Sequence, residues 1–457
     1  MTAGKTAREV LANRLEAEGD LAGARAAYDE ALALDSGSQT LAEGRARIAI
    51  ALGEADTAQH CARALAFHHD YPDRQVQMML VAAAILGEAA IPFFDDILRR
   101  YPGHVGAHEA VSELRAEWGW ADRFTESYRD ALQTDPSNKP LLLSYWTVLS
   151  RARRYAEVLA SMSAHRSLFE GDRNFALMEV NVASHAGLVA EAAALIERLD
   201  SEPDALLARA QVRLQTGDVA EASNILERVT KLESGNQTAW SLTELAWRLL
   251  GDARHDWLIH QPGLFGTRSL SLDEKELRQI AEMLRTLHAR RAPPIGQSVR
   301  GGTQTAGQLF MRAEPEIRRL TEALGAAIRD FAIDLPAYDP GHPLLRYRHD
   351  GLAFGPSWSV RLTGGGFHAS HFHPNGILSS ACYISIPDPG GDGDREGWLE
   401  LGRPPAELKI DVPPLASIKP EAGRLVLFPS FLFHGTRPFG GGERLSVAFD
   451  LVAVPMS

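Results

Sequence analysis

Cysteine is almost absent from this sequence. Its 457 residues contain two, Cys61 and Cys382, far apart in the chain. Two distant cysteines exclude a disulfide framework and a thiolate metal cage, and they favour a reducing, cytoplasmic setting. A basic charge balance is also missing, since the formal net charge is −12 at pH 7. Without a general cationic field the chain is not expected to bind nucleic acid, whereas basic protein partners are compatible with it.

The first residues lack the apolar core of a signal peptide, because residues 1–5 lead directly into charged helix-forming residues. One long apolar run does occur, over residues 78–98, but Gly87 and Glu88 interrupt it and Asp95 follows near its end. We expect this run to form two buried helices rather than a membrane span.

Strand patterns are lacking in the first half, where small and apolar residues recur with a regular period. Gly19, Gly53 and Gly87 lie 34 residues apart, and so do Pro102 and Pro136. This pattern resembles the tetratricopeptide repeat, a helix–turn–helix unit of 34 residues. We count about seven such repeats, and the resemblance implies a superhelix whose concave groove binds a peptide or protein.

The repeat pattern is imperfect, since the unit near Arg153-Arg154-Tyr155 has lost its glycine. Two roles stay open for the array. It either binds a peptide or protein partner in its groove, or it only forms a homodimer or supports the second half of the chain.

The composition changes after Trp257, where prolines and glycines interrupt the helical pattern. Ser271 and Glu274 then form a capping-box pattern ahead of an amphipathic helix, and a second helix is predicted over residues 317–331. The polar, glycine-bearing stretch 297–305 between them is expected to be a loop. It is either a substrate-facing lid, which would carry Arg300 and Gln304, or an ordinary connector.

The last hundred residues have the alternation of β-strands. Strands are predicted over residues 357–362, 377–386, 398–401, 424–428 and 444–452. Short strands at this spacing, after two helices, predict a double-stranded β-helix (jelly roll) with flanking helices. The fold expected for the whole chain is therefore α+β and multidomain, with an all-α tetratricopeptide-like superhelix over residues 1–256 and the jelly roll over 257–457.

Three histidines in the second half have the spacing of metal ligands. His371 and His373 flank Phe372, so on a strand their side chains point to the same face. His434 follows an apolar run, residues 428–433, that would place it in an apolar surface from which water is excluded. Imidazole suits iron, and a facial set of three ligands leaves coordination positions open.

These histidines belong to a longer motif. Its residues are Trp358, His371-Phe372-His373-Pro374, Tyr383, Phe428-Pro429-Ser430, His434-Gly435-Thr436 and Arg444-Leu445-Ser446. The motif resembles the family of iron(II)- and 2-oxoglutarate-dependent oxygenases found in phage and bacterial proteins, whose members often carry tetratricopeptide repeats in front. The resemblance covers about residues 260–457.

The resemblance implies a role for each motif residue. His371 and His434 would bind iron(II), and His373 stands where the wider superfamily usually has Asp or Glu. Arg444 would pair its planar guanidinium with the far carboxylate of 2-oxoglutarate, and Ser446 would add a hydroxyl on the same strand face. If His373 does not bind, the site resembles the two-histidine aspartyl hydroxylases, with water in the gap. His368 is an alternative ligand, disfavoured by the glycine-led turn before it.

The remaining candidates surround the implied iron site. Tyr383 is expected beside the co-substrate, and Trp358, Asn375, Arg300 and Gln304 in the substrate pocket. Trp358 and Tyr383 are equally compatible with a plain core position. No catalytic side chain is expected beyond the ligands of the metal and the co-substrate.

The implied activity is a dioxygenase that uses iron(II), 2-oxoglutarate and O2 to hydroxylate a residue of a peptide or protein. Hydroxylation of a free amino acid or small metabolite is the second possibility. A cupin-type dioxygenase also uses a His-x-His pair, but it expects a glutamate shortly after the pair, and residues 375–378 contain none. A non-enzymatic repeat scaffold with a decayed barrel is the third possibility, and the intact set of histidines disfavours it.

Overall fold

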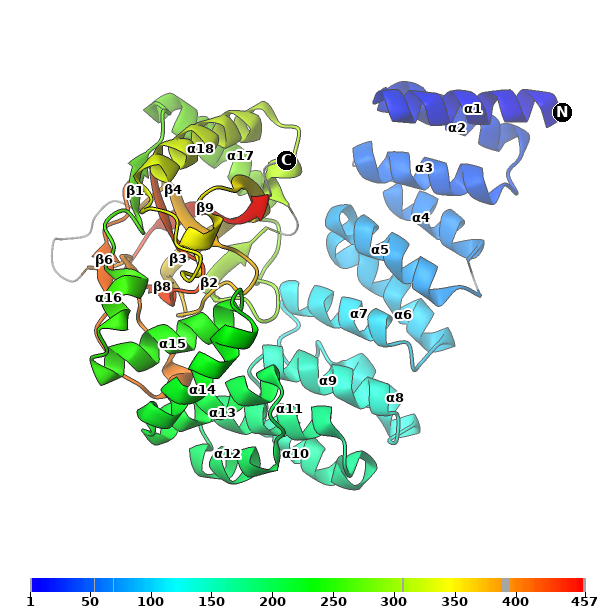
Figure 1. Ribbon diagram of the computed structural model, residues 1–457. Coiled ribbons are helices and arrows are strands. Elements are labelled where there is room, and N and C mark those ends of the chain that lie inside the picture. Colours follow the sequence, from blue (N-terminus) through cyan, green and yellow to red (C-terminus); the bar gives the residue numbers. More distant parts are fainter. Residues whose placement is uncertain (1, 53, 69, 306–307, 388–394, 455–457) are drawn as a thin grey trace. The chain divides into compact units, whose positions relative to one another are not determined.

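The computed structural model of the chain (Figure 1) describes residues 2–52, 54–68, 70–305, 308–387 and 395–454. The chain divides into two compact units, Met1–Leu149 and Ser150–Ser457. The division falls within helix α9 (Lys139–Arg151). This boundary divides the chain into two densely packed parts. It does not test the change from helical repeats to jelly roll that is predicted after residue 256, and that domain boundary stays a prediction.

The first unit is helical. Its helices are α1 (Thr2–Glu18), α2 (Leu21–Leu34), α3 (Gln39–Leu52), α4 (Thr57–Ala66), α5 (Pro72–Leu86), α6 (Ile91–Arg100), α7 (Val105–Glu117), α8 (Glu126–Thr134) and most of α9. A small residue lets a large one pack closely between neighbouring helices: a Cβ atom on Gly44 would lie 2.3 Å from the Tyr28 ring. Gly19 has a φ of 80° in the turn before α2, and Gly53 lies outside the described residues.

The apolar run of the first unit forms two helices, as predicted, but they are only partly buried, since Leu80, Val81 and Ile85 are exposed. Taken as one segment, Pro72–Arg100 is long and apolar enough to cross a membrane by length and composition, which alone is weak evidence of a span. In the structure α5 ends at Leu86, a turn of 3-10 helix follows, and α6 begins at Ile91. Both helices contribute to one hydrophobic core, through residues such as Met79 and Phe94.

The second unit begins with further repeat helices. They are α10 (Tyr155–His165), α11 (Arg173–His185), α12 (Val189–Leu195), α13 (Pro203–Thr216), α14 (Val219–Leu232), α15 (Gln237–Leu250) and α16 (Arg254–Ile259). Within the described residues, α1 to α14 make seven consecutive helix pairs, the number expected from the sequence. Gly187 and Gly217 lie two residues before α12 and α14 with φ of 77° and 84°, and Arg153 occupies the same place before α10 with φ of 60°.

Two antiparallel sheets form the C-terminal part of the second unit. One has the strand order β1-β7-β4-β9-β3-β2 and the other the order β6-β5-β8. The strands are β1 (Gly266–Ser269), β2 (Val299–Gln304), β3 (Gly351–His368), β4 (Leu378–Ser385), β5 (Leu399–Leu401), β6 (Ala416–Ile418), β7 (Arg424–Pro429), β8 (His434–Thr436) and β9 (Glu443–Val454). A jelly roll of two sheets is the predicted fold, and each predicted strand is present.

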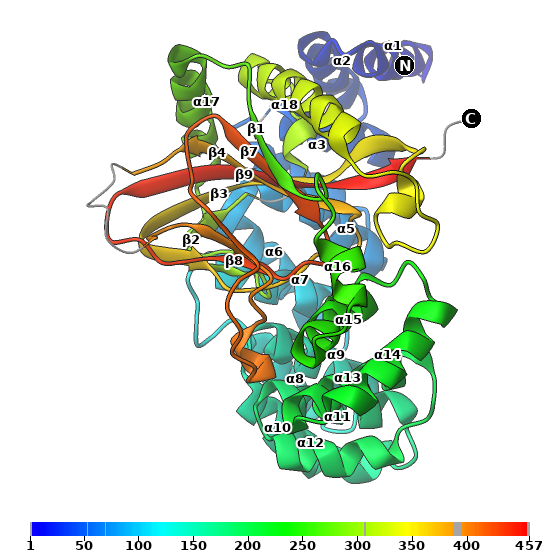
Figure 2. The same ribbon diagram turned by 60° about the vertical axis from the view of Figure 1, so that its left-hand side comes forward.

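The six-stranded sheet has one face for helices and one for polar groups. Helices α17 (Glu274–Leu287) and α18 (Pro315–Asp334) lie on one face (Figure 2) and form a hydrophobic core with alternate β9 residues, such as Val447 and Phe449. Because side chains alternate along a strand, Arg444, Ser446 and Asp450 lie on the opposite face. That face carries the candidate site.

The stretch 297–305 is not a loop, and that prediction is wrong. Residues Val299–Gln304 form β2, an edge strand paired with β3. Its register shifts between Arg300 and Gly302, and the intervening Gly301 has a φ of 70°. A Cβ atom on Gly302 would lie 2.2 Å from the carbonyl oxygen of Arg361. The glycines that suggested a loop therefore serve a β-bulge and a close backbone approach.

The predicted capping box is displaced by two residues. Helix α17 begins at Glu274, and its capping box joins Asp273 to Glu276 rather than Ser271 to Glu274. Both pairs have the spacing of a capping box, and the structure uses the pair with the carboxylate as N-cap.

Candidate metal and co-substrate site

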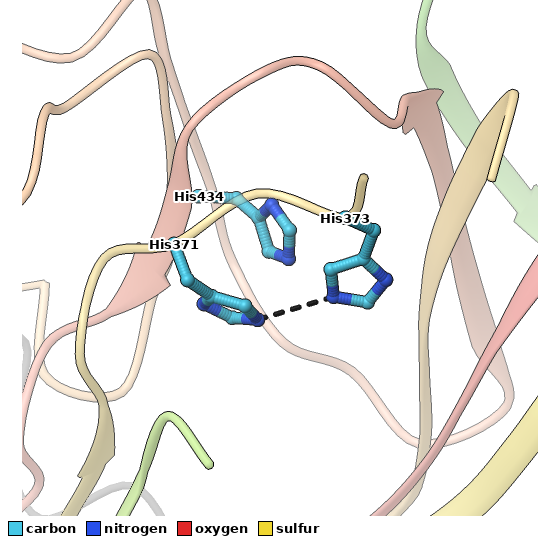
Figure 3. A group of neighbouring side chains, drawn as sticks. All are labelled: His371, His373 and His434. Atoms are coloured by element: carbon cyan, nitrogen blue, oxygen red, sulfur yellow. Dashed lines mark hydrogen bonds between the residues drawn. The ribbon is translucent and has the colours of Figure 1, made fainter. Parts of the chain in front are cut away.

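Main-chain hydrogen bonds bring the three predicted histidines together. His371 and His434 form an isolated antiparallel bridge, with N···O distances of 3.0 and 2.8 Å. The His373 N–H donates to the carbonyl of Ser430 at 3.0 Å. One ring nitrogen from each histidine lies within 4.8 Å of the others, and the rings surround a common point (Figure 3). The two distant segments therefore converge as the spacing predicts.

Two of the rings are oriented by backbone carbonyls. The Nδ1 of His371 lies 2.9 Å from the Ala369 carbonyl, and the Nδ1 of His434 lies 3.0 Å from the Leu432 carbonyl. A carbonyl only accepts, so Nδ1 must be the protonated nitrogen of both neutral rings. The Nε2 lone pairs of His371 and His434 are therefore available to a metal.

The third ring is oriented by a carboxylate that sequence reasoning missed. His373 Nδ1 donates to Asp450 Oδ1 at 2.5 Å, and the Ser379 hydroxyl donates to the same oxygen at 2.7 Å. Asp450 is buried. Its sequence signal is a carboxylate within the otherwise apolar run 447–454 of β9, an even number of residues after Arg444 and so on the same face. A carboxylate behind a ligating histidine is a common means of orienting the ring.

The separation of two ring nitrogens fits a shared metal ion. His373 Nε2 and His371 Nε2 lie 3.1 Å apart. With both Nδ1 atoms protonated, two lone pairs face each other at this distance, an arrangement that a cation between them stabilises. For a metal–nitrogen bond of about 2.1 Å, two ligands at a right angle are about 3 Å apart.

Protonation of His371 and His434 does not compete with a metal at neutral pH. Burial, with a smaller contribution from the neighbouring His373, lowers the pKa of His371 to about 3. Burial also holds the pKa of His434 well below the usual value for histidine. Neutral imidazoles converging through Nε2 are a donor set suited to iron and other first-row metals.

A buried guanidinium lies on the same face of the sheet. Arg444 is 2% exposed and donates to the Gly397 carbonyl at 2.7 Å and to the Thr436 hydroxyl at 3.0 Å. Among the described residues, Arg444 Nε and the Tyr383 hydroxyl are buried polar atoms without a hydrogen-bond partner. The Arg444 guanidinium carbon lies 6.0 Å from the centre of the Tyr383 ring. Two unsatisfied donors beside a buried cation suit a carboxylate, as the co-substrate prediction requires.

The other predicted residues of this face lie in one row across four strands. Ser446 pairs with Val360 on β3 and with Tyr383 on β4, and Gln304 on β2 pairs with Val360. Residues in such a row share a face of the sheet. Ser446 therefore accompanies Arg444, and the buried Gln304 belongs to the same wall.

The remaining substrate candidates lie in different surroundings. The half-buried Trp358 has its ring centre 5.6 Å from that of His373, so it flanks the candidate metal centre. Arg300 lines a cavity together with residues 368–370. Asn375 is exposed in the turn after the histidine pair, and the structure does not bring it into this cluster.

The alternative ligand His368 is not part of the histidine group. Its Nδ1 lies 3.0 Å from the Ser298 hydroxyl, and its ring centre lies 6.2 Å from that of His371. Burial lowers its pKa well below the usual value for histidine. His368 is thus a neutral ring beside the candidate centre.

Repeat helices support both segments that carry the histidines. Phe372, between the paired histidines, and Phe433, just before His434, meet edge to face at 5.7 Å. Both pack in one hydrophobic cluster with residues of α13, α14 and α15, such as Leu242 and Leu245. The candidate centre is therefore built on the repeats as well as on the jelly roll.

The jelly roll, the three converging imidazoles and the buried arginine agree with the iron(II)- and 2-oxoglutarate-dependent oxygenase domain that the sequence predicts. Residues 356–450 match the model of a family described as “Putative 2OG-Fe(II) oxygenase”. The chain thus carries an oxygenase domain of this type behind helical repeats. No curated protein sequence matches the chain.

Solved structures with partial likeness include enzymes and a repeat protein. A Pseudomonas putida prolyl-4-hydroxylase is 16% identical with a TM-score of 0.29, covering 41% of this chain and 91% of that one. HygX from Streptomyces hygroscopicus, with nickel and 2-oxoglutarate bound, is 17% identical with a TM-score of 0.29, covering 43% and 84%. A tetratricopeptide repeat protein from Parabacteroides merdae is 14% identical with a TM-score of 0.30, covering 53% and 99%.

Proposed function

We propose that this oxygenase hydroxylates a residue of a peptide or protein. The observation that carries the proposal is the convergence of three Nε2 atoms beside a buried arginine whose Nε has no partner among the described residues. When bound, iron(II) and 2-oxoglutarate supply the oxidising chemistry, in which O2 is consumed, succinate and CO2 are released and a substrate C–H bond becomes C–OH.

The chain's own residues bind and orient these groups. His371, His373 and His434 would hold the metal through Nε2, and Arg444 with Ser446 and Tyr383 would hold the far carboxylate of 2-oxoglutarate. Three neutral imidazole ligands would leave a bound metal more positive than two histidines and a carboxylate would, which favours the anionic co-substrate. The buried walls around Arg444 exclude water from the reaction.

A cavity that reaches His371 supports a peptide substrate. A cavity of about 400 Å³ reaches His371, and repeat residues such as Tyr155, His185 and Gln211 line it opposite the jelly roll. We propose that the repeats present the peptide to the metal from this side. The volume also lies in the range of small-molecule sites, so a free amino acid or small metabolite is the second candidate.

Succinate release tests the oxygenase. The protein with iron(II) and 2-oxoglutarate should release succinate, and more of it with a candidate peptide. The Arg444→Ala variant should use 2-oxoglutarate about 10- to 100-fold less well, because hydrogen bonds to a charged group are lost, while cobalt(II) titration shows that metal still binds. The exposed Arg278→Ala on α17 is the control. Loss of metal by Arg444→Ala, or no succinate under any condition, would contradict the proposal.

A further inference from the structure

The cavity that reaches His371 is cationic, although the protein has a net charge of −12. A second cavity of about 760 Å³ adjoins it and shares Arg153 and Glu407 with it. The cations that line the two cavities are Arg151, Arg153, Arg300, Arg403, Lys409 and Arg437. The carboxylates are Glu400, Glu407 and Asp411. The local excess of positive charge, beside the proposed reaction centre, favours an anionic ligand.

Arg153 stands where three of the other helix pairs have glycine. Its φ of 60° is left-handed, and the residues at the same place before α2, α12 and α14 are all glycines. The left-handed region is unfavourable for a side chain such as arginine, and strained residues of this kind cluster at functional sites. The Arg153 side chain pairs with Glu407 and lines both cavities. Its position therefore points to a role in the cavity rather than in the repeat.

Arg300 faces the same region from β2 of the jelly roll. Its guanidinium donates to the backbone carbonyls of Gln297 and Val299, at 2.7 and 2.8 Å. Burial and the positive charge of Arg153 lower its pKa, and Glu407 opposes them. Glu407 is paired with Arg153 from the repeats, and Arg300 from the jelly roll lines the same cavity without a carboxylate partner among the described residues. The two arginines therefore carry one positive charge more than Glu407 balances.

We propose that Arg153 and Arg300 form a subsite for a carboxylate side chain, so that the peptide substrate is acidic near the residue that is oxidised. Guanidinium groups bind carboxylates through paired hydrogen bonds, and a partly desolvated pair does so selectively. The inference rests on the proposed function, since it assigns the substrate class of that same site.

Peptide binding tests this subsite directly. The probes are three pools of short fluorescent peptides. All three pools are randomised at the same positions, and the remaining fixed positions hold glutamate in the first pool, glutamine in the second and lysine in the third. Anisotropy is measured with the full chain loaded with cobalt(II) and 2-oxoglutarate. The glutamate pool should bind about tenfold more tightly than the glutamine pool, and added salt should reduce this preference. Equal binding of the glutamate and glutamine pools would overturn the inference.

Variants assign the preference to the two arginines. Arg153→Gly introduces the residue found at this turn in other repeats, so it should melt at the same temperature or higher and yet lose most of the glutamate preference. Arg300→Gln should lose it too, whereas Arg278→Gln, exposed on α17, should keep it. If the Arg153→Gly protein is well folded and still binds the glutamate pool over the glutamine pool as strongly as the parent does, the subsite is overturned.

Succinate release separates this inference from the proposed function. If no pool increases succinate release by the iron(II) protein but the glutamate preference depends on Arg153, the subsite stands and the proposed function fails. If all three pools increase succinate release equally, the proposed function stands and the subsite is overturned.

Discussion

Asp450 acts on the candidate metal centre through another residue. It accepts the Nδ1 hydrogen of His373 and leaves Nε2 to face the metal. Asp450→Asn should weaken metal binding about 10- to 100-fold, because an amide holds the ring and its tautomer less firmly than a carboxylate. Calorimetric titration with cobalt(II) measures the effect, and Asp330→Asn, exposed on α18, is the control. Unchanged affinity in Asp450→Asn would show that His373 does not depend on this hydrogen bond.

His288 makes stability depend on pH. It is buried between the hydroxyls of Thr303 and Ser359. Burial, with a smaller contribution from Arg361, lowers its pKa to about 4. The unfolded chain takes up the proton below about pH 6.5 and the folded chain only near pH 4. The stabilisation is therefore complete above about pH 6.5 and is lost as the pH falls towards 4, by at most about 3 kcal/mol.

Urea unfolding at a series of pH values measures this loss. His288→Gln should lose less stability than the parent between pH 7 and pH 4.5, because the side chain no longer binds a proton on unfolding. His260→Gln, in which the replaced ring is half exposed, should follow the parent. A parent-like slope in His288→Gln would show that His288 is not the group responsible.

Among the elements, the segment before β8 connects the repeats to the candidate centre. Phe433 is 3% exposed, packs with α13 to α15 and precedes His434. Phe433→Ala should lower the free energy of unfolding by about 3–5 kcal/mol and weaken cobalt(II) binding, because the strand that carries the histidine loses its support. Phe94→Ala, at an equally buried site of the first unit, should destabilise that unit and leave metal affinity unchanged. Equal metal affinity in both variants would contradict the link.

At the scale of the whole molecule, the repeats of the second unit are part of the oxygenase. Arg248 on α15 donates to the Gly402 carbonyl at 2.8 Å, and Gln215 on α13 donates to the Glu407 carbonyl at 2.8 Å. Trp240 and Trp247 of α15 share a hydrophobic cluster with Phe428 of β7. These contacts lie within one compact unit, so the unit rather than the jelly roll alone should fold.

Truncation tests this expectation. A fragment of residues 137–457, which keeps α9 whole, should be soluble and bind cobalt(II) like the full chain. A fragment of residues 257–457 should aggregate or lose metal affinity, because it exposes the faces of Phe372, Phe433 and Leu408 that pack on the repeats. If the shorter fragment binds metal as well as the full chain, the boundary predicted at residue 256 marks an independent domain.

Much of the fold follows from local pattern. Alternation along residues 444–452 places Arg444 and Ser446 on one face of a strand and Val447 on the other, and β9 has this arrangement. Edge strand β2 was missed because its glycines serve a bulge, and a bulge depends on the partner strand. A local sequence pattern shows the alternation of side chains along a strand, but it does not show which strand pairs with it.

By itself the sequence determined the helical repeats, the strands, the three histidines and the arginine with its serine, because periodicity and short spacing are local properties. The tertiary structure decided what depends on contacts between distant residues. It placed Asp450 behind His373, left Arg444 Nε and the Tyr383 hydroxyl without partners among the described residues, and brought Arg153 and Arg300 into the lining of one cavity. Which side chains meet is decided by packing and strand pairing over long separations, and a single sequence does not record those.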